Sequence, residues 1–239
     1  LEALFIGSSI HAFGINKDIE ANGCILDTLD ALRGSTIPAV IIGNLAPRSD
    51  KSHKNGAPFY VARSGTTVIT TTKSCVALLA KLGLLDSLEE TDVETVCRVF
   101  LPEAEALRIA NSQFRSFEYL PRLALWAHKG KNFPAIVSAF PELASNCIWW
   151  IDNFGNAKTT ITESELKAQI QNSTVTLTIE GTAQTFPFYQ RLADVPKDNN
   201  PACIIGSSGY DTTRFAEIVI QGKSASAELG LVSGMEIML

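Results

Sequence analysis

Hydrophobic and polar residues predict an alternation of helices and strands in the first part of the chain. Apolar side chains recur at helical spacing in residues 17–32, and short apolar runs at residues 3–6 and 39–42 fit buried strands on either side of that helix. Residues 76–85, 102–110 and 114–131 also predict helices, and Pro102 stands at a first-turn position.

Further strands are expected between these helices. Residues 59–61 and 66–71 are rich in β-branched or aromatic side chains, and residues 96–100 are expected to form another strand after the polar residues Thr91, Asp92 and Glu94. Strands that alternate with helices are typical of an α/β fold with a mostly parallel sheet.

The hydrophobic period changes to two after residue 160. Threonines alternate with Val175, Leu177 and Ile179 in residues 174–179, so one face of that segment is polar and the other is apolar. Shorter apolar runs at residues 147–151, 202–205, 217–220 and 235–239 predict more strands, with short helices at residues 164–171 and 224–229. Many short strands separated by glycine turns favour a small all-β barrel. We therefore expect an N-terminal α/β domain at residues 1–145 and a C-terminal β-barrel domain at residues 146–239.

The junction between the two patterns carries the sequence DNFGN at residues 152–156. It follows an apolar strand, and its carboxylate, amides and bare glycine backbone suit a polar ligand. The same residue types also favour an ordinary turn. Both interpretations remain open at this point.

Composition and charge narrow the class of protein. The chain has 239 residues, 46% of them hydrophobic, and a formal net charge of −5 with scattered charges, which disfavours nucleic acid as the main partner. No apolar run approaches the ~18–20 residues of a membrane span, and residues 1–10 lack a basic leader. The five cysteines form no close pair, which favours reduced thiols and a cytoplasmic location. With three histidines and no ligand-spaced cluster, no metal site is expected.

Common catalytic motifs are missing. The sequence contains no GxxxxGK[ST] phosphate loop and no GxGxxG after its first predicted strand. Residues 206–209 (GSSG) lack the G-x-S-x-G spacing of a hydrolase elbow and are expected to form a turn. The polar loop at residues 44–58 is longer than most connections, which indicates either a functional loop or a solvated surface loop.

Several segments, in order, resemble the family of S-adenosylmethionine (SAM) hydroxide adenosyltransferases and the related fluorinases and chlorinases. Residues 152–156 are similar to the family's D-x-F-G-N, and residues 206–209, 217–225 and 229–230 are similar to its S-S-G…E-I-A-V-x-x-G-x-A…L-G. Residues 114–121 (FRSFEYLP) resemble its F-H-G-R-D-I-F-A-P with one residue missing.

The resemblance implies a homotrimer with SAM pockets between subunits. The implied reaction is displacement at the 5′ carbon of the ribose by hydroxide or halide, with methionine leaving. It further implies that Asp152 and Ser207 or Ser208 hold the amino-acid end of the ligand, while Asn156 and the backbone near Ser224 meet the adenine. The residues carried over to binding of SAM or another adenosine-type ligand are Asp152, Phe154, Asn156, Ser207, Ser208, Ser224 and Ala225.

The catalytic array of the family is altered in this sequence. Its histidine is replaced by Arg115, which cannot serve as a base near neutrality, and its aspartate loop corresponds to residues 44–51 with Asn44 in place of the aspartate. The candidates for catalysis are therefore Asn44, Arg48 and Arg115. Two hypotheses follow: a divergent adenosyltransferase that converts SAM into adenosine or a 5′-substituted adenosine and methionine, or a catalytically silent trimeric protein that binds such a ligand or is purely structural.

Overall fold

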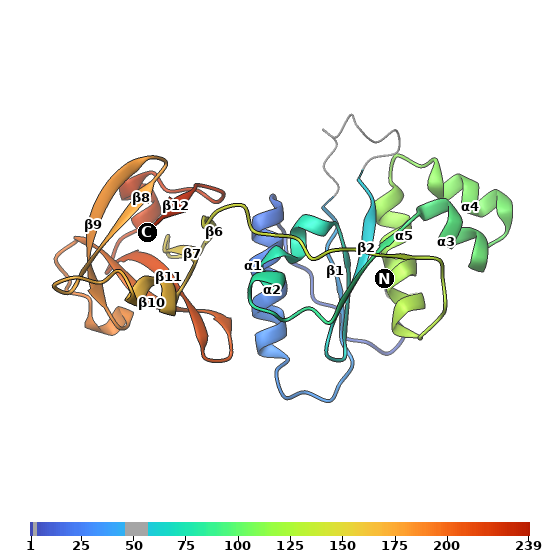
Figure 1. Cartoon of the computed structure of the whole chain (residues 1–239), viewed down its shortest axis with the longest axis horizontal. Coiled ribbons are helices and arrows are strands. Elements are labelled where there is room, and N and C mark those ends of the chain that lie inside the picture. Colours follow the sequence, from blue (N-terminus) through green and yellow to red (C-terminus); the bar gives the residue numbers. More distant parts are fainter. Residues whose placement is uncertain (2–3, 46–56) are drawn as a thin grey trace. The chain divides into compact units, whose positions relative to one another are not determined.

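The computed structural model describes residues 1, 4–45 and 57–239 (Figure 1). The chain divides into two compact units: unit 1 comprises Leu1–Ala21 and Gly34–Glu142, and unit 2 comprises Asn22–Arg33 and Leu143–Leu239. The division falls inside helix α1 (Asp18–Ala31). The predicted domain boundary between residues 145 and 146 stays a prediction. Among the described residues, no helix combines the length and apolar character that a membrane crossing requires.

Unit 1 contains a mixed sheet. Its strands, in spatial order, are β1 (Val40–Ile42), β3 (Thr67–Thr71), β2 (Phe59–Ser64), β4 (Ser87–Thr91) and β5 (Ile136–Val137). Of the pairings between these described strands, β1 with β3 is parallel, and the pairings β2–β3, β2–β4 and β4–β5 are antiparallel. The prediction of a mostly parallel sheet is therefore wrong. The physical reason is that β2 and β3 are joined by a tight turn at Gly65, which allows only antiparallel pairing.

Helices follow several of the strands of this sheet. They are η1 (Lys73–Val76), α2 (Ala77–Lys81), α3 (Val93–Phe100), α4 (Glu103–Ala110) and α5 (Arg115–His128). Apolar side chains of β2 and β3 form one buried cluster with those of α3, α4 and α5. The predicted strand at residues 96–100 is wrong: Asp92 accepts a hydrogen bond from the Thr95 N–H at 2.8 Å, which caps α3, and these residues belong to that helix, in which Val96 and Cys97 are buried. Residues 4–6 form turns instead of the predicted strand.

Unit 2 is built on a seven-stranded sheet that nearly closes into a barrel. Its strands, in spatial order, are β12 (Ile237–Met238), β8 (Thr174–Ile179), β9 (Thr182–Tyr189), β10 (Pro201–Tyr210), β11 (Thr213–Ile220), β7 (Ala157–Thr162) and β6 (Ile148–Ile151). A bridge between Cys147 and Glu236 joins the two end strands, and the Ile148 N–H donates to the Met235 carbonyl at 2.9 Å. The predicted C-terminal β-barrel is thus present in this barrel-like form.

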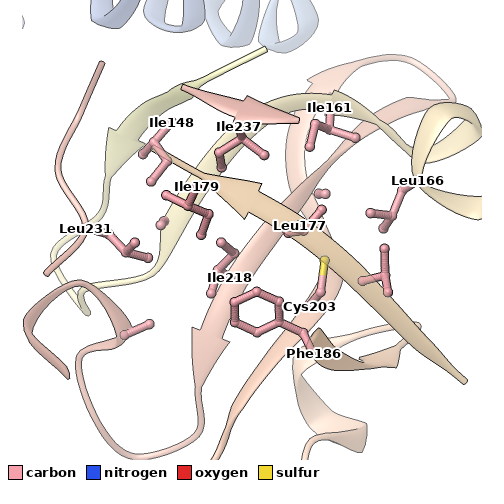
Figure 2. Packing of buried hydrophobic residues seen from close by; sticks show 14 of the residues in the cluster. Ile148, Ile161, Leu166, Leu177, Ile179, Phe186, Cys203, Ile218, Leu231 and Ile237 are labelled. Carbon is pink, nitrogen blue, oxygen red and sulfur yellow. The ribbon is translucent and has the colours of Figure 1, made fainter. Parts of the chain in front are cut away.

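Side chains from several strands and from two short helices form the hydrophobic core of unit 2. Figure 2 shows the buried cluster, in which Phe186, Leu177 and Ile218 come from three different strands. The short helices α6 (Glu163–Lys167) and α7 (Ala225–Leu229) contribute Leu166 and Ala225 to it, and the turn η2 (Leu192–Asp194) follows β9. The alternation predicted for residues 174–179 is confirmed, because the apolar members are buried.

Residues 22–33, which include the second part of α1, belong to unit 2 through close contacts. Gly23 faces Trp149, whose side chain is 2% exposed, and Asp30 forms an ion pair with Arg214 at 2.7 Å. A Cβ atom on Gly23 would lie 2.0 Å from the Trp149 ring atom Cε3, so only glycine permits this approach.

We predict that Gly23→Ala destabilises the protein. Alanine gains about 1 kcal/mol of helix propensity, but forcing a methyl group into a packed site costs about 1–3 kcal/mol. The free energy of unfolding, measured with urea, should fall by up to about 2 kcal/mol. Gly14→Ala is the control, since no described atom beyond its chain neighbours lies within 4 Å of the place that a Cβ would take there. A Gly23→Ala protein as stable as the wild type would contradict this packing.

Candidate functional site

The loop at residues 152–156 is held by its own aspartate. Asp152 Oδ1 accepts hydrogen bonds from the backbone N–H groups of Phe154 and Asn156, both at 2.9 Å. Asp152 Oδ2 accepts from Asn156 Nδ2 at 2.9 Å. The loop is therefore a turn, as one of the two interpretations predicted, and the Asp152 carboxylate acts first as its organiser.

The same loop is locked to the beginning of α7. Gly155 has φ +82°, and a Cβ at this position would lie 2.0 Å from Ser224 Oγ. The Gly155 carbonyl accepts a hydrogen bond from the Ser226 N–H at 2.8 Å, while Ser224 Oγ caps α7 by accepting from the Ala227 N–H at 3.1 Å. The predicted residues 152–156 and 224–225 are thus brought together.

This loop pair presents an aromatic ring to solvent. Phe154 is 80% exposed, although its neighbour Asn156 is buried. A large apolar side chain that is exposed on a fixed loop is suited to stacking on a flat ligand.

Ser207 and Ser208 lie within strand β10, which continues past them with a register shift between Ile205 and Gly209. The prediction of a turn at this point is wrong. Lys158 on β7 donates from Nζ to Ser208 Oγ at 2.7 Å and to Ser207 Oγ at 3.4 Å. The Lys158 ammonium is also paired with Glu217 on β11 at 3.1 Å, and both side chains are largely buried.

Asp27 on α1 completes this second polar group. Its Oδ2 accepts from Ser208 Oγ at 3.0 Å and its Oδ1 accepts from the Gly209 N–H at 3.1 Å. Burial raises the pKa of Asp27 above its ordinary value of 3.8, although those two hydrogen bonds and the charge of Lys158 oppose the shift.

The predicted catalytic residues lie in unit 1. Asn44 is exposed just after β1, and Arg48 lies outside the described residues. Arg115 is the first residue of α5; its guanidinium lies 5.4 Å from the centre of the Phe59 ring and donates to the Ala57 carbonyl at 3.3 Å. Burial lowers the pKa of Arg115, yet an arginine so placed remains a cation at neutral pH.

Sequence reasoning missed Asp27, Lys158 and Glu217. Lys158 is the single charge of β7, and Glu217 is flanked by apolar residues in β11; such isolated charges inside apolar stretches are a signal of buried pairing. No local signal marks Asp27, because its partner Ser208 is 181 residues away. Among the described residues, no group of three or more His, Cys, Asp and Glu side chains could hold a metal ion.

Comparison with known proteins gives the following matches. The SAM hydroxide adenosyltransferase C-terminal domain matches at residues 146–238. No curated protein matches the chain. An uncharacterised conserved protein from Thermotoga maritima has a similar structure, with 13% identity, a TM-score of 0.67 and coverage of 99% of this chain and 90% of its own. A conserved hypothetical protein from Thermus thermophilus is similar at 17% identity, with a TM-score of 0.56 and coverage of 93% and 81%, respectively. These two likenesses concern the fold alone.

We predict that Asp152→Ala loosens the 152–156 loop. The variant loses the acceptor of three hydrogen bonds, so its free energy of unfolding should fall by about 1–3 kcal/mol. The matched control is Asn153→Ala, an exposed neighbour expected to change stability by less than about 0.5 kcal/mol. Urea unfolding curves that coincide for the two variants would show that Asp152 does not organise the loop.

The raised pKa of Asp27 predicts a pH dependence. Just above pH 3.8 the folded state holds the Asp27 proton more tightly than the unfolded state, so the contribution of this group to stability falls as pH rises through that window. The free energy of unfolding of the wild type should therefore fall relative to that of Asp27→Asn as pH increases.

Asp30 supplies a control of opposite sign. Burial raises the pKa of Asp30, but hydrogen bonds from the Asp211 N–H and from Arg214 outweigh that effect and leave it lowered. The stability of the wild type relative to Asp30→Asn should consequently grow as pH rises toward and past 3.8. Equal slopes for both differences would refute the assignment.

Proposed function

This chain belongs, through its residues 146–238, to the SAM hydroxide adenosyltransferase family, and on that premise we propose that it is a divergent SAM-dependent adenosyltransferase-like protein. It binds an adenosine-type ligand and displaces the group on the 5′ carbon of the ribose. With SAM as substrate the products are adenosine, or a 5′-substituted adenosine, and methionine.

The observation that carries the proposal is the rigid loop pair of unit 2. Asp152 fixes the 152–156 loop from within, and the contact between Gly155 and Ser224 fixes it to α7. The backbone that carries Phe154 is therefore fixed before a base stacks on its exposed ring, so Phe154 is our main contact for adenine. Ser224 lies next to the same loop, whereas Ala225 is buried in the core of unit 2.

The role of Asp152 in this proposal is positioning. Both of its carboxylate oxygens already accept hydrogen bonds inside the loop. Asn156 is likewise largely buried and its side-chain amide is bonded to Asp152. Their effect on binding therefore passes through the placement of Phe154.

Displacement at the 5′ carbon of SAM requires little acid or base catalysis from the protein. A sulfonium leaves without protonation, so an active site needs mainly to position and desolvate a nucleophile. The exposed amide of Asn44 can orient a water molecule, since it both donates and accepts hydrogen bonds. Arg48 is proposed as a second orienting group. We also propose that the protein forms a homotrimer and that it is located in the cytoplasm.

A second candidate is a silent adenosine-binding protein, and the contacts of Arg115 favour it. The Arg115 side chain lies over the Phe59 ring and is bonded to the Ala57 carbonyl, which is a structural use of the residue. An arginine cannot replace a histidine as a general base. In this version unit 2 binds the ligand and no reaction follows.

We predict that Phe154→Ala weakens binding of adenosine and SAM by about 5- to 100-fold in calorimetric titrations, the range that base stacking supplies. Met238→Ala is the control, since Met238 is also exposed in unit 2. Titrations in which Phe154→Ala binds as tightly as the wild type would remove Phe154 from the site. Chromatography of SAM incubated with the wild type separates the two candidates: adenosine and methionine support the enzyme, whereas binding without products supports the silent protein.

A further inference from the structure

Strand β5 leaves an apolar edge of the unit 1 sheet uncovered. Among the described strands it stands at the end of that sheet, paired with β4 on one side only. Ile136 is 73% exposed and Val137 is 84% exposed, although neighbouring side chains of a strand point to opposite faces. The sheet is therefore bare on both faces at β5. Natural sheets protect such edges with charged residues or proline, and β5 itself contains neither.

This edge is fixed in position by unit 1 itself. The Ser138 N–H donates to the Leu88 carbonyl of β4 at 2.9 Å, and Lys73 Nζ of η1 donates to Ser138 Oγ at 3.0 Å. Alternate residues of a strand direct their backbone groups to opposite edges, so the N–H and C=O of Val137 point away from β4. Val137 thus offers one donor and one acceptor on a strand that needs little further ordering before it pairs.

The sequence around this edge is complementary to a second copy of itself. In residues 131–142 (KNFPAIVSAFPE) the only charged side chains are Lys131 and Glu142, which have opposite signs, stand at opposite ends and are both exposed. An antiparallel second copy aligned on Val137 brings each charge near the opposite charge of the other copy, whereas a parallel copy would bring like charges together. This alignment also sets the outward-facing backbone of Val137 against itself, as an antiparallel hydrogen-bonded pair requires.

We propose that β5 is a self-association site, at which two copies of this chain pair in antiparallel fashion around a two-fold axis at Val137. Each Val137 N–H then donates to the Val137 carbonyl of the other copy, and the unit 1 sheets of the two copies become one continuous sheet. Two-fold contacts are the commonest between identical chains, because the same patch is used on both. This inference uses unit 1 alone, so it goes beyond the proposed function and does not depend on it.

Self-association is tested by analytical ultracentrifugation of the full chain. In Val137→Lys two ammonium groups would meet at the axis, so the particle should have half the wild-type mass or less. Val99→Lys is the control and should keep the wild-type mass, since Val99 is 50% exposed on α3 of the same unit. Equal masses for the wild type and Val137→Lys overturn the proposal. The homotrimer of the proposed function is judged separately, by whether Val137→Lys still forms particles of three chains.

The alignment on Val137 is tested with Val137→Cys. The Cα atoms of an antiparallel hydrogen-bonded pair lie about 5.5 Å apart, which is within the range that a disulfide bridges. Mild oxidation should therefore join two copies through this cysteine, and a non-reducing gel should show a band of two chains that dithiothreitol removes. The wild type and Val99→Cys are the controls and should give little of this band, because four of the five native cysteines are buried. A Val137→Cys protein that gives no more of the band than Val99→Cys overturns the pairing.

Discussion

Pairing of the buried charge on Lys158 is the constraint on which unit 2 depends. An ammonium taken out of water is tolerated only where partners replace its hydration. Glu217 supplies the opposite charge, and Ser208 passes the interaction on to Asp27. These four residues come from strands β7, β10 and β11 and from helix α1. Their interactions therefore fix the register of three neighbouring strands together with the position of the helix.

The two polar systems of unit 2 have different functions. In the loop at residues 152–156 the carboxylate of Asp152 accepts hydrogen bonds from backbone N–H groups. These bonds fix the backbone that carries the exposed ring of Phe154. In the second system Lys158 bonds directly to Glu217 and is linked to Asp27 through the Ser208 hydroxyl. Asp152, Asn156 and Ser208, which matched the family's motifs in the sequence, therefore stabilise the fold of unit 2. The residue of these motifs that is most exposed to solvent is the aromatic Phe154.

Local periodicity was enough to predict much of the fold, and distance along the chain limited the rest. Residues 17–32 and 174–179 have long, regular patterns, and the structure confirms a helix and a strand there. Residues 96–100 were ambiguous, since four apolar residues flank Arg98, and the decisive information was the cap at Asp92. Strand β4 was missed because its sequence SLEET has few apolar residues and it pairs on both sides in the sheet. In the candidate site, the link between loop 152–156 and α7 joins distant segments, and only the order of family motifs pointed to it.

Helix α1 has a consequence for how this protein could have been assembled in evolution. Its residues from Asn22 onward are part of unit 2, through Gly23 against Trp149 and Asp27 against Ser208, although the rest of that unit begins at Leu143. A protein fragment that contained only the barrel would expose Trp149, which packs against Gly23. It would also lack Asp27, which is bonded to Ser208 beside the buried Lys158. The barrel is thus not an exchangeable module: it can be inherited or recombined intact only together with a helix encoded more than a hundred residues upstream.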